Sequence, residues 1–178
     1  REIPAMKPEI TGYNLGAGAD LVVALGASNT AGYGVGEALA YPAVIERFLR
    51  ERGIAATIRN AGVSGETTGQ MLARLDASVP AGARVVLFQP GSNDARLGYP
   101  DAVREQNIAI ITQRLTARGI AVIRVAAAFE AARPGNLQAD GIHYTAAGHE
   151  MIARLLLDEV AAALKLRRQA GPPHLRRT

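Results

Sequence analysis

The chain of 178 residues contains no cysteine, which excludes both disulfide bonds and a metal site built on thiolates. No run of 18 or more apolar residues occurs, so the sequence predicts no membrane-spanning helix. The chain begins at Arg1 rather than Met, which predicts that an upstream segment, either a signal peptide or an expression tag, has been removed. What is present, 48% hydrophobic and 20% charged residues, is typical of a globular domain.

The formal net charge of +4 suggests a nucleic-acid-binding protein, but its distribution argues against that class. Five basic residues and no acidic ones lie between Lys165 and Thr178, so the rest of the chain is nearly neutral. No aromatic residue is interleaved with these arginines, so the segment offers no platform for base stacking. We therefore predict a single domain over 1–178, with a surface-wrapping segment at 1–20, a flexible basic tail at 165–178 and no nucleic-acid partner.

Four short apolar runs alternate with segments of helical periodicity, which predicts a parallel sheet with helices on both faces. The predicted strands are 21–25, 54–59, 84–88 and 120–125. A helix is predicted after each of the first three strands, the second helix being stopped by Pro80, and a loop with Pro134 and Gly135 precedes the last helix. The predicted fold class is α/β, a three-layer α/β/α sandwich of four strands, or five if the amino-terminal segment adds an edge strand.

Polar, glycine-rich clusters follow the strands, and ligands bind at this edge of such sheets. These clusters are 26–34, 60–68 and 91–94, and a fourth at 140–143 precedes the last helix. An ester hydrolase needs an activated hydroxyl, a base, a group that orients the base, and donors for the oxyanion. The four clusters together contain a candidate for each of these roles.

Histidine is the natural base near neutral pH, and the chain contains three. His174 lies in the basic tail, and His149 falls inside the last predicted helix, where we expect a surface or capping role. His143 follows Asp140 by three residues across a glycine-containing turn, so the carboxylate can orient one ring nitrogen while the other faces a serine. Asp140 is also explained as a turn residue, because Asp-Gly is a common turn pair.

Ser28 is the candidate nucleophile, although Ser64 and Ser92 are rival hydroxyls at the same edge and Ser28 is also explained as a helix cap. Gly65 and Asn93 are candidate oxyanion donors, with a turn glycine and an Asx turn as the alternatives. The sequence contains no G-x-S-x-G elbow, no P-loop and no dinucleotide-binding glycine pattern. Three scattered histidines without cysteine also argue against a transition-metal site.

In this order, the four clusters resemble the blocks of the SGNH (GDSL-type) hydrolase superfamily, most of all its small bacterial arylesterase and lysophospholipase/thioesterase I-like members. The resemblance implies a flavodoxin-like fold and a catalytic triad of Ser28, Asp140 and His143. It also implies an oxyanion hole made by the backbone N–H groups of Ser28 and Gly65 and the amide of Asn93. The implied function is a serine esterase or thioesterase that acts on small acyl esters through an acyl-enzyme, without a metal or organic cofactor.

Three departures from the superfamily pattern are expected to matter. Ala27 stands where an aspartate normally precedes the nucleophile, which removes a residue that braces this loop. Tyr144 replaces the proline that commonly follows the histidine, which reshapes the pocket rim. The stretch 125–140 lacks the helix and strand usually inserted there, so we expect a site that is open on one side and suited to small or extended acyl groups.

Other functions would use the same residues, namely hydrolysis of acetyl or acyl esters on carbohydrates, or transfer of an acyl group to an alcohol. A non-catalytic ligand-binding domain is the alternative from another class, and Ala27 supports it. The expected partner is a small-molecule ester or thioester. The sequence leaves open the acyl chain length, the oligomeric state and whether the protein is periplasmic, secreted or cytoplasmic.

Overall fold

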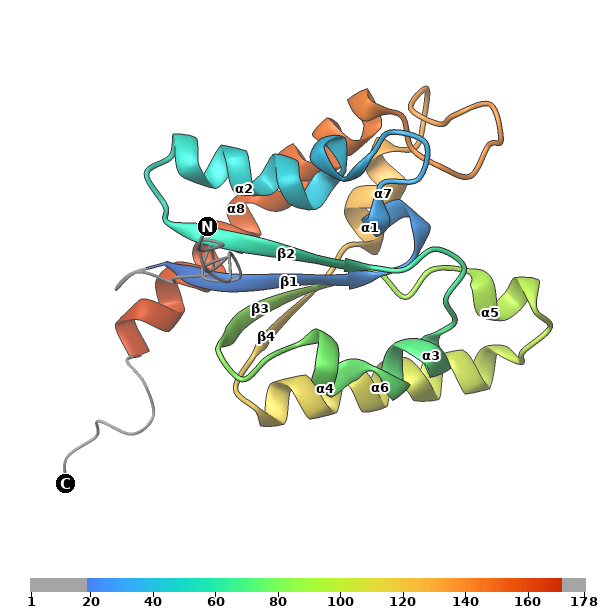
Figure 1. Ribbon diagram of the computed structural model, residues 1–178, viewed down its shortest axis with the longest axis horizontal. Helices are drawn as coiled ribbons and strands as arrows, with labels where there is room; N and C mark the ends of the chain where they lie inside the picture. The colour runs from blue at the N-terminus through green and yellow to red at the C-terminus, as the bar shows by residue number, and fades with distance from the viewer. Residues whose placement is uncertain (1–18, 171–178) are drawn as a thin grey trace, which may run out of the picture.

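The computed structural model describes residues 19–170, and the side chains of residues 19–166. Four parallel strands form one sheet in the order β2–β1–β3–β4, with β1 at Asp20–Gly26, β2 at Ala56–Gly62, β3 at Ala83–Phe88 and β4 at Ala121–Arg124. The carboxyl ends of all four strands therefore lie at the same edge of the sheet (Figure 1). This confirms the predicted parallel sheet of four strands, and residues 1–18, where a fifth strand was considered, lie outside the described residues.

Helices cover both faces of the sheet, which confirms the three-layer α/β/α sandwich (Figure 1). One face packs against α2 (Tyr41–Glu51), α7 (Ala126–Ala132) and α8 (Ala146–Ala170), and the other against α3 (Thr68–Ala73), α4 (Leu75–Ser78) and α6 (Asp101–Ala117). Three short helices lie in the connections: α1 (Ser28–Ala31), the 3-10 helix η2 (Glu37–Leu39) and α5 (Asn93–Arg96).

The strand β1 is buried on both faces because its side chains alternate between two hydrophobic clusters. Val22 and Ala24 pack in the cluster beneath α2 and α8, whereas Val23 and Leu25 pack in the cluster with α4 and α6. All four side chains are fully inaccessible to solvent. A shift of one residue would exchange the two faces, so this burial fixes where β1 ends and hence where the following loop begins.

The second strand differs from the prediction at both ends. The structure begins β2 at Ala56 because the N–H of Ile54 bonds to the carbonyl of Leu49 and closes the end of α2. It continues to Gly62, three residues past the predicted end, because the residues up to Gly62 pair with β1 as far as Gly26.

Two helix predictions were also wrong. The helix expected from Met71 to Val79 is interrupted at Arg74, which separates α3 from α4. The stretch after β4 was expected to lead directly into the 140–143 turn, but it contains the helix α7. Because Phe129 and Ala132 of α7 are buried against α8 and the sheet, this helix covers part of the side that was expected to be open.

The last helix is longer than predicted, since α8 continues to Ala170 and includes the first residues of the predicted flexible tail. Residues 171–178 lie outside the described residues, as does nearly all of the predicted amino-terminal wrap. Among the described residues, no helix is both long and apolar enough to cross a membrane.

Candidate active site

The candidate nucleophile begins a short helix directly after the buried strand β1. Ser28 is the first residue of α1, and its Oγ lies 2.9 Å from Nε2 of His143. The last residue of β1 has to be glycine, because the side chains of Thr30 and Gln89 pack directly against Gly26. A Cβ at this position would lie 2.2 Å from Oγ1 of Thr30 and 2.6 Å from Oε1 of Gln89. The local sequence therefore places the serine hydroxyl at the carboxyl edge of the sheet, in hydrogen-bonding contact with the histidine.

The loop that carries Ser28 is braced by a neighbouring strand end, although Ala27 has no polar side chain. Oε1 of Gln89 accepts the N–H of Ala27 at 3.0 Å and the hydroxyl of Thr30 at 2.8 Å. The phenol of Tyr41 lies 2.8 Å from Oγ1 of Thr30, and burial raises the pKa of Tyr41, so the phenol is neutral. Because Thr30 gives its one hydroxyl proton to Gln89, the phenol is the donor of this bond. These buried hydrogen bonds provide the brace that the sequence led us to expect was lost.

A second buried group extends this network into the core. Nδ1 of His149 accepts the N–H of Tyr41, the first residue of α2, at 3.0 Å. The side chain of His149 is fully inaccessible, and burial lowers its pKa to about 4, so the imidazole is neutral at physiological pH. Of the two roles expected for His149, a surface position is therefore wrong, and it caps α2 from the neighbouring helix α8.

The turn that carries Asp140 and His143, residues 137–144, is called here the acid–base turn. It is held by its own backbone and by Asp140. The turn is closed by an antiparallel bridge between Leu137 and Tyr144. Oδ1 of Asp140 accepts the N–H groups of Ile142 and His143 at 2.9 and 3.0 Å, while Oδ2 lies 2.5 Å from Nδ1 of His143. Asp140 therefore fills both roles that the sequence suggested, since one oxygen forms the turn and the other orients the imidazole.

The protonation states of this pair follow from the same contacts. The side-chain hydrogen bond from His143, followed by the two backbone N–H groups, lowers the pKa of Asp140 to about 2. An ionised carboxylate only accepts hydrogen bonds, so Nδ1 of His143 must carry the proton. Nε2 is then free to accept the hydroxyl proton of Ser28, which is the arrangement of a serine, a base and an orienting acid.

Two further residues fix the imidazole and were missed by the sequence analysis. Asn29 connects the two loops, because its Nδ2 donates to the carbonyl of Ile142 at 3.3 Å and its Oδ1 accepts the N–H of Tyr144 at 3.2 Å. The ring of Tyr33 lies against the imidazole of His143, with 4.1 Å between ring centroids. The position of Asn29 directly after the nucleophile was the only signal in the sequence.

The two candidate oxyanion donors lie on the loops after β2 and β3. Gly65 has a φ of +82°, a conformation that favours glycine. In the part of the chain that the structure describes, its N–H has no hydrogen-bond partner. Nδ2 of Asn93 donates to the carbonyl of Glu66 at 2.9 Å and Oδ1 accepts from Arg96 at 3.3 Å, which fixes the amide. An amide nitrogen carries two hydrogens, so one remains for a substrate oxygen.

The loops after β2 and β3 are tied to each other by a buried carboxylate. Asp94 is 2% exposed, and its two oxygens accept the N–H and the hydroxyl of Thr68 at 2.8 and 2.5 Å. The pair formed by Arg74 and Glu66 fixes the loop after β2 to the end of its own strand, because Arg74 also donates to the carbonyl of Ala61 at 2.8 Å. Arg74, whose side chain bonds to the end of β2, is also the residue at which α3 and α4 are separated.

The rival hydroxyls lie elsewhere on the same edge. Ser64 and Ser92 are exposed, and among the described residues neither forms a hydrogen bond to a histidine. In residues 19–166, no group of three or more histidine, aspartate or glutamate side chains lies together in a way that could hold a metal ion.

Residues 24–137 match the GDSL-like lipase/acylhydrolase family. This chain belongs to that family. The matched stretch contains Ser28, Gly65 and Asn93, whereas Asp140 and His143 follow it directly. The contacts of Asp140 and His143 with the nucleophile loop therefore come from the structure and not from the family match.

Individual family members show how far the likeness extends. An arylesterase of Vibrio mimicus is 32% identical over 106 residues, 57% of this chain and 52% of that protein. The thioesterase 1/protease 1/lysophospholipase L1 of Escherichia coli K12 is 34% identical over 102 residues, 57% of this chain and 48% of that protein. The chain spans about half the length of the curated relatives it matches.

A solved structure extends the likeness to most of the fold. The crystal structure of AlinE4, described as an SGNH-hydrolase family esterase, is 30% identical and superposes with a TM-score of 0.60. The superposition covers 82% of this chain and 97% of that one. The fold of this chain is therefore that of an SGNH hydrolase.

Proposed function

We propose that this protein is a serine esterase or thioesterase that hydrolyses small acyl esters through an acyl-enzyme intermediate. The observation that carries the proposal is the 2.9 Å contact between Oγ of Ser28 and Nε2 of His143, together with the 2.5 Å contact between Nδ1 and Asp140. A hydroxyl paired with an oriented imidazole is activated for attack on a carbonyl. The names of the curated relatives, an arylesterase and a thioesterase/lysophospholipase, support the same reaction class.

In the first half of the proposed reaction, Nε2 of His143 takes the proton of Ser28 as Oγ bonds to the carbonyl carbon. The carbonyl oxygen becomes an oxyanion, and the N–H groups of Ser28 and Gly65 with Nδ2 of Asn93 donate to it. Donors fixed before the reaction cost little reorganisation when the charge forms. The tetrahedral intermediate then breaks the bond to the leaving group, which receives the proton from Nε2.

In the second half, water replaces the leaving group. Nε2 of His143 takes a proton from water as its oxygen attacks the acyl carbon of the ester on Ser28. The same donors hold the second oxyanion, and collapse releases the acid while the proton returns to Oγ. The carboxylate of Asp140 stabilises the imidazolium in both halves without becoming protonated, in keeping with its lowered pKa.

The first test is Ser28→Ala measured on a chromogenic short-chain ester. Without the nucleophile we expect kcat to fall on the order of 10⁴–10⁶-fold, while the melting temperature stays close to that of the wild type. Ser64→Ala is the matched control, because it removes an exposed hydroxyl at the same edge that has no contact with His143 among the described residues. If the Ser28→Ala protein keeps its activity, Ser28 is not the nucleophile.

A further inference from the structure

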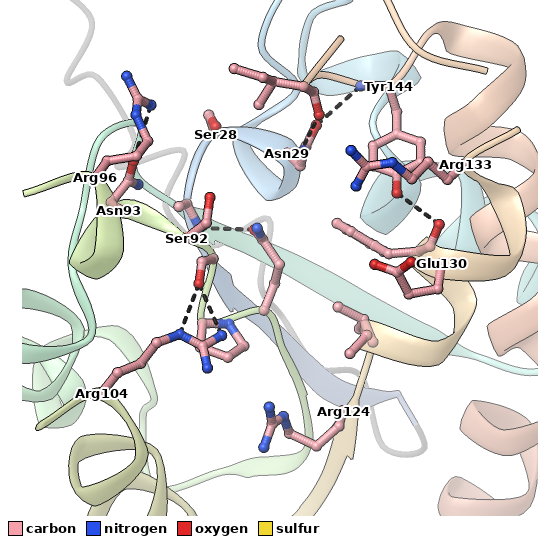
Figure 2. A pocket seen from close by; sticks show the side chains of 18 of the residues that line it. Ser28, Asn29, Ser92, Asn93, Arg96, Arg104, Arg124, Glu130, Arg133 and Tyr144 are labelled. Carbon is pink, nitrogen blue, oxygen red and sulfur yellow. Dashed lines mark hydrogen bonds between the residues drawn. The ribbon is translucent and has the colours of Figure 1, made fainter. Parts of the chain in front are cut away.

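A pocket of about 310 Å³ opens beside Ser28 and is lined largely by charged and polar groups (Figure 2). The nucleophile loop and the loop after β3 form one wall, the end of β4 with α7 forms the other, and residues 141, 142 and 144 of the turn that carries His143 border it as well. Its lining contains a single acidic residue, Glu130, and four arginines: Arg96, Arg104, Arg124 and Arg133. This excess of positive charge is local, since the sequence outside the basic tail is nearly neutral.

The four arginines differ in how far they are already engaged. Arg104 donates from Nε and Nη2 to the carbonyl of Gly91 and from Nη1 to Glu105, and Arg96 donates to Asn93. Arg124 and Arg133 are exposed, and the guanidinium group of neither forms a hydrogen bond or an ion pair with another described residue.

The position of Arg124 suits contact with a ligand. It is the last residue of β4, and its guanidinium carbon lies 5.5 Å from the ring centroid of Phe88. Contact with an aromatic ring holds a guanidinium in place while leaving its donors accessible. Figure 2 shows Arg124 and Arg133 approaching the pocket from the side of β4 and α7. The wall opposite the nucleophile loop therefore contains two guanidinium groups whose N–H donors are not engaged by other described residues.

Such a lining favours one class of ligand. A guanidinium binds a carboxylate through two parallel hydrogen bonds, and a cleft lined by one sign of charge concentrates ligands of the opposite sign. Sites for purely apolar chains are instead lined mostly by hydrophobic side chains. The pocket is consequently suited to a short chain that ends in a negatively charged group.

The position of His143 indicates which part of the ester, the acyl group or the leaving group, enters the pocket. In the proposed function, His143 protonates the leaving group, so the leaving group must lie against the imidazole. The pocket is lined by Ser28 and Asn93 and by residues on either side of His143 (Gly141, Ile142 and Tyr144), whereas His143 itself and Tyr33 are not among its described lining residues. The acyl arm, on the other side of the reacting carbon, therefore extends into the pocket.

Resting on the proposed function, we propose that the preferred acyl group carries a terminal anion, so that the substrate is a monoester of a short dicarboxylic acid. The unengaged guanidinium group of Arg124 or of Arg133, which lie at different ends of the pocket (Figure 2), binds the free carboxylate, and Arg96 and Arg104 add to the positive field while holding the loop after β3. Glu130, the one acidic side chain of the lining, offsets only part of this positive charge.

The kinetic test compares esters that differ only in the charge of one arm. Monoethyl glutarate carries the anion on the acyl arm, and ethyl pentanoate is its neutral counterpart. In 4-acetoxybutanoate the anion lies on the alcohol arm instead, and butyl acetate is the neutral counterpart of that ester. We expect kcat/KM for monoethyl glutarate to exceed that for ethyl pentanoate about 10–100-fold, the effect of a hydrogen-bonded charge pair. The Arg124→Gln, Arg133→Gln double variant should remove most of this ratio.

The matched control is Arg114→Gln on the exposed side of α6, which lowers the net charge outside the pocket and should leave the ratio unchanged. Equal kcat/KM values for monoethyl glutarate and ethyl pentanoate would overturn the inference while leaving the esterase function intact. A preference confined to 4-acetoxybutanoate would overturn the assignment to the acyl arm.

A binding measurement separates the inference from the proposed function. Ser28→Ala protein is titrated calorimetrically with monoethyl glutarate and with ethyl pentanoate at low and high salt. We expect salt-sensitive binding of the anion alone, weakened about tenfold or more by Arg124→Gln with Arg133→Gln. If no ester is hydrolysed but this binding is found, the proposed function fails and the anion site stands; absence of such binding overturns the anion site.

Discussion

The nucleophile loop, residues 26–33, and the acid–base turn, residues 137–144, meet at several contacts, among them that of Ser28 with His143 and the hydrogen bonds of Asn29, but they are held in different ways. The nucleophile loop follows a fully buried strand and is fixed by Gln89 and Thr30 from inside the protein. Half of the residues of the acid–base turn are exposed, and its geometry comes mainly from Asp140 and from backbone bonds within the turn, with Asn29 as one polar contact to the nucleophile loop. The candidate nucleophile thus depends on the packed core, whereas the candidate base depends mainly on a local turn.

This difference implies that mutations in the two regions have different signatures. Disturbing the turn should affect catalysis with little change in stability, because few buried groups depend on it. Disturbing the network behind the nucleophile loop should lower both stability and rate, because the same buried hydrogen bonds serve both.

The largest effect is expected from Asp140→Asn. The new side chain keeps an oxygen for the turn but presents an NH₂ group to Nδ1 of His143, which forces the proton onto Nε2. Nε2 can then no longer accept from Ser28, so kcat should fall about 10³–10⁴-fold while the melting temperature changes little. Asp158→Asn, at an exposed ion pair with Arg52, is the control. A loss below tenfold would mean that Asp140 serves only the turn.

An intermediate effect is expected from Gln89→Leu, which keeps the volume but removes the acceptor for Ala27 and Thr30. Two buried donors would be left without a partner, so the free energy of unfolding should fall by about 2–4 kcal/mol. A shift of Ser28 should also lower kcat, by up to about 10²-fold. Gln113→Leu on the exposed face of α6 is the matched control. Lost stability with an unchanged kcat would show that the network does not position the nucleophile.

The smallest effect appears only in acid and concerns His149. Its pKa is lowered from 6.5 to about 4 by burial, so between these pH values the unfolded chain binds a proton that the folded protein does not bind. Its contribution to stability is complete above pH 6.5 and is lost as the pH falls toward 4, amounting to about 3 kcal/mol.

Urea unfolding of the wild type between pH 7.5 and 4 measures this loss. His149→Asn keeps an acceptor for the N–H of Tyr41 but has no titrating group, so its free energy of unfolding should change less over the same range. Parallel pH profiles for the two proteins would contradict the buried neutral state of His149.

The sequence predicted the fold well where burial is complete. The central strand β1 and the strand β3 read clearly because their side chains are apolar on both faces. The strand β2 was displaced because it lies at the edge of the sheet and most of its residues are only partly buried. The helix α7 was missed because Ala126–Ala132 is mostly alanine, which gives little contrast between an apolar and a polar face.

The candidate site was predicted to a similar extent. Ser28, Asp140 and His143 were identified by their order and by their place after strands, and the structure brings them into contact. Gln89 was not identified, because its role depends on a glycine 63 positions earlier that leaves room for its side chain. The arginines of the pocket belong to four separate segments, so no local pattern in the sequence connects them.

The central claim, that Ser28 is a nucleophile activated by His143, is tested most directly by covalent labelling. The protein is treated with a fluorophosphonate, and the modified peptide is located by mass spectrometry. We predict a single stoichiometric adduct on Ser28, and a rate of labelling reduced at least tenfold in His143→Gln, in which the base is absent. An unmodified protein, or an adduct on Ser64 or Ser92 instead, would contradict the claim.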